Sequence, residues 1–143
     1  MILFAAVTIP AIERSKKVTA KRTTLTALNH ALAPDTVKGY QLVPFEDHLL
    51  IRIPDNATFA QGRYELSDMR LEGREILDGI AERLRQDSLL TKIDQIAVVG
   101  HTSSEGLDDR NWLLSAQRAV TVATYLVTKG HISACQVGAE GRG

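Results

Sequence analysis

The sequence predicts an α/β fold of the order βαβαβ, in which two helices pack on a small mixed sheet. Short apolar segments that fit strands occur at 48–53, 95–99 and 135–139, and two longer amphipathic segments lie between them. Strands that alternate with helices need crossover connections, so at least part of the sheet is expected to be parallel. A chain of 143 residues is long enough for one such domain with a core of its own.

The first strand is expected at His48–Ile53, between Pro44 and Pro54. Its two sides alternate, with Leu49, Ile51 and Ile53 on one and His48, Leu50 and Arg52 on the other.

The first long helix is expected to begin at Ser67, which is a good N-cap, with Asp68 in the first turn where the helix dipole favours an anion. Apolar residues then recur at spacings of three and four, as on a helix that covers one face of a sheet: Leu77, Ile80, Ala81 and Leu84.

A buried strand is expected at Gln95–Val99 and is expected to end at Gly100. The second long helix should run from about Asp109 to Lys129, with Gly130 as its left-handed cap. The last strand is expected at Cys135–Ala139. Cys135 is the only cysteine, so it has no disulfide partner, and we expect it to be a small buried apolar residue.

The N-terminal part, residues 1–37, is expected to be a membrane-proximal segment and a linker helix, and residues 38–143 the folded domain. The apolar run Met1–Pro10 is about half as long as the ~20 residues of a membrane span. It is either the end of a membrane helix or a short element packed on the domain, and the basic residues that follow favour the first reading. Within Val18–Ala33, Leu25, Leu28 and Leu32 share one side of a plausible helix.

Composition and missing motifs exclude several functions. Seventeen basic and seventeen acidic side chains cancel, so no bulk charge attracts nucleic acid. The sequence has neither a nucleotide-binding glycine motif nor a Gly-x-Ser-x-Gly elbow. His101 is better explained by loop stability than by catalysis, and the other histidines show no metal-ligand spacing. We therefore expect no enzyme activity, no cofactor and no metal.

The most informative segment begins at Gly100. It contains Gly100-His101-Thr102, Gly106, Asn111, Leu114-Ser115 and Arg118-Ala119. This pattern predicts a strand, a polar loop and then a helix that carries Asn, Ser and Arg beside apolar positions. Such an arrangement is suited to a small charged ligand.

These motifs resemble the OmpA-like peptidoglycan-binding domain, which is found in OmpA, in Pal lipoproteins and in the MotB-type stator subunits of rotary motors. The resemblance runs from near Asp47 to Gly143 and includes Phe59, Glu65-Leu66-Ser67, Tyr125-Leu126 and Gly141-x-Gly143. It implies a noncovalent pocket for the diaminopimelate side chain of peptidoglycan stem peptides. The implied ligand-binding residues are Thr102, Ser103, Glu105, Asn111, Leu114 and Arg118.

Arg118 matches the family arginine, whose planar guanidinium grips a carboxylate through two hydrogen bonds. Asn111 matches the family asparagine, and Thr102 and Leu114 would complete the wall. From the residues alone, two simpler readings stay open. For Arg118, the simpler reading is a surface residue paired with Asp108 or Asp109. For Asn111, it is capping of the helix N-terminus.

The sequence departs from the family pattern at two places. Ser103 occupies the position where the family places an aspartate for the ligand ammonium, and Glu105 is the candidate to replace that carboxylate. The family also continues past its Gly-x-Gly, whereas this sequence stops at Gly143. Either the sequence is an excised fragment, or the domain is C-terminally shortened with an open sheet edge and a less complete pocket. Such an open edge would favour a homodimer.

The resemblance implies an anchoring module of the bacterial cell envelope, with the domain in the periplasm and an N-terminal helix in the inner membrane. The favoured version is a MotB-like subunit that binds peptidoglycan and has a MotA-like channel subunit as a candidate partner. The alternative is an OmpA-like interaction or dimerisation scaffold that has lost peptidoglycan binding, with Ser103 as the mark of that loss.

Overall fold

The computed structural model describes residues 23, 25–32, 39–45, 48–101 and 108–142. The run Met1–Pro10 and the loop 102–107 lie outside this part. The described elements are, in order, β1 (Gln41–Pro44), β2 (Leu49–Arg52), α2 (Asp55–Thr58), α3 (Leu71–Arg85), α4 (Leu89–Lys92), β3 (Ile96–His101), α5 (Asp108–Thr128) and β4 (Val137–Arg142), with single 3₁₀ turns at Leu66–Asp68, Gln86–Ser88 and Ala134–Gln136.

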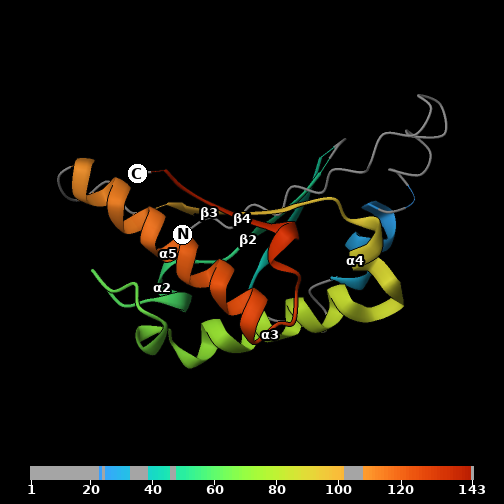
Figure 1. The fold of residues 1–143 in the computed structure, drawn as a ribbon, viewed down its shortest axis with the longest axis horizontal. Helices are drawn as coiled ribbons and strands as arrows, with labels where there is room; N and C mark the ends of the chain where they lie inside the picture. Colours follow the sequence, from blue (N-terminus) through green and yellow to red (C-terminus); the bar gives the residue numbers. More distant parts are fainter. Residues whose placement is uncertain (1–22, 24, 33–38, 46–47, 102–107, 143) are drawn as a thin grey trace.

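The strands form two pairs. β1 and β2 are antiparallel, and β3 and β4 are parallel, with Ile96 beside Val137. A parallel pair needs a long crossover, and α5 supplies it by packing on both β3 and β4 (Figure 1). The expected α/β fold and its parallel pairing are confirmed. In the described residues, however, the pairs are separate two-stranded sheets, and β1 is a strand that we did not expect. β2 is also buried on both sides, including Leu50.

The helix α3 is confirmed, and its buried residues include Leu77, Ile80 and Leu84, but it begins at Leu71 and not at Ser67. Ser67 lies in a 3₁₀ turn instead. Met69 forms an isolated antiparallel bridge with Phe59, and the Arg70 N–H donates to the Thr58 carbonyl at 2.8 Å. These contacts hold 69–70 extended, so the helix cannot begin earlier.

Two glycines bring α5 very close to the parallel pair. Gly100 of β3 and Gly141 of β4 lie side by side in the sheet. A Cβ added at Gly100 would lie 2.1 Å from the Ser115 carbonyl oxygen, and one at Gly141 would lie 2.4 Å from the Ala116 nitrogen. β3 continues through Gly100 to His101, so the prediction that Gly100 ends the strand is wrong. Its missing side chain makes room for the backbone of α5.

The end of α5 also differs from expectation. Gly130 does not have positive φ; the residue in the left-handed region is His131, with φ 56°. After it, the Ile132 N–H donates to the Leu126 carbonyl at 3.1 Å and closes the helix end. A Cβ at Gly130 would lie 3.0 Å from that of Ala81, so this glycine permits close contact with α3. Cys135 is exposed in a 3₁₀ turn before β4, contrary to the expected burial and strand.

Residues 25–31 are helical, within the segment where we expected a linker helix. Leu28 in this helix and Leu32 directly after it are fully buried in the same core as α3. Two side chains fix its end, because Tyr40 donates to the Leu32 carbonyl at 2.5 Å and Arg83 donates to the Ala31 carbonyl at 2.8 Å. This helix therefore packs as part of the folded body, while the domain division at residue 38 stays a prediction.

None of the helices in the described ranges combines the length and the apolar character that crossing a membrane requires.

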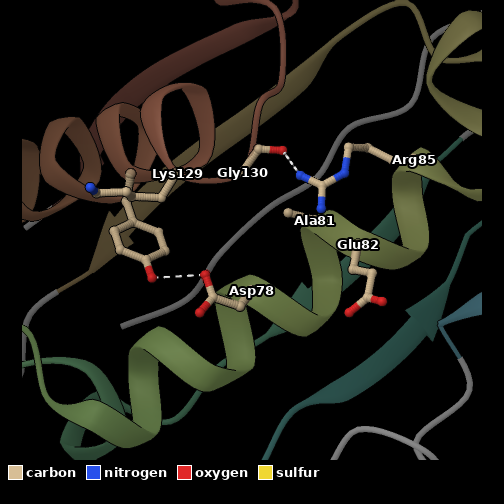
Figure 2. A pocket seen from close by; sticks show the side chains of 7 residues that line it. Asp78, Ala81, Glu82, Arg85, Lys129 and Gly130 are labelled. Carbon is tan, nitrogen blue, oxygen red and sulfur yellow. Dashed lines mark hydrogen bonds between the residues drawn. The ribbon is translucent and has the colours of Figure 1, made fainter.

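Polar contacts also join α3 to the second half of α5. A cleft of about 360 Å³ lies between them (Figure 2). In this cleft the Tyr125 hydroxyl donates to Asp78 Oδ1 at 2.8 Å, and the Arg85 guanidinium donates to the Gly130 carbonyl. Burial and then the hydrogen bond to Asp78 raise the pKa of Tyr125 to about 12. The folded state therefore favours the neutral phenol.

This shift predicts a pH-dependent stability. An unfolded tyrosine ionises at about pH 10, so the contribution of Tyr125 is complete below that pH and is lost as the pH rises towards about 12. Urea unfolding at stepwise alkaline pH should show a steeper loss of unfolding free energy in the parent than in Tyr125→Phe, with Tyr64→Phe as the control for losing a phenol elsewhere. Parallel curves for the parent and Tyr125→Phe would contradict this assignment.

Candidate ligand-binding site

Three of the predicted site residues lie on one face of α5. Asn111, Leu114 and Arg118 follow one another at spacings of three and four, which places them along one side of the helix. Asn111 is the fourth residue of α5. The other three predicted residues, Thr102, Ser103 and Glu105, lie outside the described residues.

Arg118 is nearly buried, with 7% of its surface exposed. Its Nε donates to the Arg63 carbonyl at 2.8 Å, and its Nη2 donates to the Ala60 carbonyl at 3.0 Å. Its Cζ lies 5.6 Å from the centre of the Phe59 ring, within the range of a cation–π interaction. Arg118 is therefore not the surface residue of the simpler reading.

The carbonyls that hold Arg118 belong to one turn, Ala60–Arg63. The Arg63 N–H donates to the Ala60 carbonyl at 3.1 Å, and Gly62, the third residue, has φ +74°. A four-residue turn with positive φ at only its third position is a type II turn, which favours glycine or asparagine there. The turn places its first and last carbonyls against one guanidinium.

Thr121, which lies one helical turn after Arg118 in α5, binds Tyr64, the residue that follows the turn Ala60–Arg63. Its hydroxyl donates to the Tyr64 carbonyl at 2.6 Å, so 59–64 is held along α5. Sequence reasoning included Phe59 but missed the turn and Thr121. The available signal was Gly62, a residue suited to a type II turn three positions after Phe59.

The charge of Arg118 has no full counter-charge in the part of the chain that the structure describes. Burial lowers the pKa of Arg118 below its usual value, yet arginine stays protonated near neutral pH. Carbonyl dipoles and an aromatic face compensate a buried cation only in part, whereas a carboxylate does so fully. The environment of Arg118 therefore favours a ligand that carries a carboxylate.

Together, these features define a small α/β domain with a candidate site for a carboxylate on the helix α5. The chain belongs to the OmpA family, which matches residues 58–143.

Individual relatives agree with this assignment. Outer membrane protein A of Bordetella avium is 39% identical over 80 residues, which are 56% of this chain and 39% of that protein. Outer membrane protein A of Serratia marcescens is 36% identical over 80 residues, which are 56% of this chain and 21% of that protein. The chain thus spans less than half the length of these curated relatives.

A solved structure of a protein described as MotB-like, from Desulfovibrio vulgaris, shares the fold. Its TM-score is 0.66 at 21% identity, and the match covers 87% of this chain and 75% of that one. The OmpA-like domain of FopA1 from Francisella tularensis has a TM-score of 0.55 at 18% identity, covering 73% of this chain and 64% of that domain. At these identities the likeness establishes the fold alone.

Proposed function

We propose that this domain binds peptidoglycan noncovalently, through the diaminopimelate of the stem peptides, and so anchors a membrane protein or a motor-like stator complex to the cell wall. The observation that carries the proposal is the nearly buried guanidinium of Arg118, which is held in place by two carbonyls and has no carboxylate partner among the described residues. The role is binding and involves no covalent step.

Diaminopimelate carries both a carboxylate and an ammonium at the end of its side chain. In the proposal the carboxylate meets Arg118, while Asn111 and Leu114 line the same face of α5 and Thr102 completes the wall. Ser103 cannot pair with the ammonium as an aspartate would, so Glu105 takes that role. Titration with a diaminopimelate-containing tripeptide tests the function, since saturable binding supports it and no binding rejects it in favour of the interaction scaffold.

We also propose the cellular setting of the domain. It lies in the periplasm of a bacterial envelope, is anchored in the inner membrane through the N-terminal segment, forms a homodimer and works with a MotA-like channel subunit. Relatives named outer membrane proteins support a place in the cell envelope, and the fold shared with a MotB-like protein is consistent with a stator subunit. The homodimer is proposed from the second edge of β4, which has no partner among the described strands. The inner-membrane anchor is proposed from the sequence of the N-terminal segment alone. An open edge favours pairing with a second copy.

A further inference from the structure

We infer that the turn Ala60–Arg63 and the ring of Phe59 form a positioning element for Arg118, which makes the guanidinium bind a ligand carboxylate end-on. This inference deepens the proposed function and rests on it for the identity of the ligand. The positioning residues touch Arg118, and in this account they act on the ligand only through it.

The hydrogen bonds of Arg118 determine which edge of its guanidinium remains available to a ligand carboxylate. A guanidinium can meet a carboxylate side-on, through Nε and Nη2, or end-on, through Nη1 and Nη2. In this domain the side-on edge already donates to the carbonyls of Arg63 and Ala60. Nη1 makes no hydrogen bond to any residue in the described ranges. The end-on edge is therefore the one whose Nη1 donors the described residues leave unused, and we assign this edge to the ligand.

The support beneath Arg118 is itself fixed. Phe59 is buried and is held by its bridge to Met69, while the hydrogen bond across the turn holds Ala60 and Arg63 together. A free arginine has many rotamers and loses that freedom on binding, which weakens affinity. Because the turn restricts Arg118 before the ligand arrives, we expect it to raise affinity without touching the ligand.

Gly62 offers a clean way to disturb the turn. It is exposed, its φ is +74°, and an added Cβ would have no atom within 4 Å. A Cβ at this position therefore meets no other atom, and a substitution is expected to act mainly through the backbone preference. Valine is strongly disfavoured at positive φ, whereas asparagine tolerates it. Gly62→Val and Gly62→Asn are thus a matched pair that separates turn geometry from the presence of a side chain.

The experiment measures the dissociation constant for a diaminopimelate-containing tripeptide in the parent and in both variants. The cost of positive φ for valine predicts that Gly62→Val binds about threefold to tenfold more weakly, while Gly62→Asn stays within about twofold of the parent. In an Arg118→Ala background, Gly62→Val should have no further effect, because the turn then has no guanidinium to position.

A second readout needs no ligand. Because the Nε–H of Arg118 donates to a carbonyl, NMR should show slow exchange of this proton with water in the parent and in Gly62→Asn, and faster exchange in Gly62→Val. Thermal melting confirms that each variant is folded.

The outcomes separate this inference from the proposed function. If the parent binds through Arg118 but Gly62→Val binds equally well, the positioning inference fails and the proposed function stands. If the Nε–H exchanges equally fast in the parent and in Gly62→Val, the turn does not hold the guanidinium and the inference also fails. If the parent does not bind the tripeptide, both the proposed function and the end-on geometry of ligand binding are contradicted.

Discussion

Arg118→Ala is expected to weaken binding of a diaminopimelate-containing tripeptide by about tenfold to a hundredfold, because a charge-assisted pair contributes about 1.5–3 kcal/mol. The substitution removes the one nearly buried cation among the described residues of the site. Calorimetric titration of the parent and the variant measures the difference. An unchanged dissociation constant in Arg118→Ala would mean that the ligand does not contact this residue.

Arg118→Lys is the matched control for charge. Lysine keeps the positive charge but cannot reach the Ala60 and Arg63 carbonyls with one planar group and still present two donors to a carboxylate. We therefore expect Arg118→Lys to bind more weakly than the parent and more tightly than Arg118→Ala. Both variants also release the turn, so circular dichroism and melting curves are needed to show that lost binding is not lost folding.

Gly100→Ala is expected to lower the free energy of unfolding by about 3 kcal/mol or more, since overpacking against rigid backbone is among the costliest substitutions. The added Cβ would lie 2.1 Å from the Ser115 carbonyl oxygen, and no side-chain rotation relieves a clash with backbone. α5 would have to move away from β3 and β4. Urea denaturation measures the loss.

Gly138→Ala provides the comparison in the paired strand. A Cβ at Gly138 meets only the end of the Gln95 side chain, at 3.2 Å, and that flexible group can move aside. Its expected effect is well under half that of Gly100→Ala. If the two variants are equally stable, the close packing of α5 on β3 does not determine stability in the way we describe.

The same packing connects the core to the site. Ser115 is buried against Gly100, and Arg118 lies about one helical turn further along α5. A displaced α5 would move Arg118 away from the turn Ala60–Arg63. The glycine pair therefore positions the site as well as the core.

Periodicity in the sequence was sufficient to predict the elements that have a clear amphipathic pattern. α3, α5, β2 and β3 all lie within a few residues of their expected positions. The exact start of α3 was not predictable, because it depends on the bridge between Phe59 and Met69, a contact that no local pattern encodes. The role of Gly100 was missed for a similar reason, since a close approach is visible only once the facing helix is known.

The site was predictable in part. Family resemblance identified Arg118, but its hydrogen-bond partners are backbone carbonyls 55 and 58 residues earlier. Because every residue has a backbone carbonyl, the residue types do not indicate which carbonyls will accept hydrogen bonds from Arg118. The docking of Leu28 and Leu32 was likewise hidden, because an apolar helix face does not reveal what it will pack against.

The most direct measurement compares two ligands that differ in one group, a stem tripeptide with diaminopimelate and the same tripeptide with lysine, which lacks the terminal carboxylate. If Arg118 binds that carboxylate, the diaminopimelate peptide should bind the parent at least about tenfold more tightly, and Arg118→Ala should remove the difference. Equal affinities of the parent for the two peptides, or no binding of either, would contradict the account.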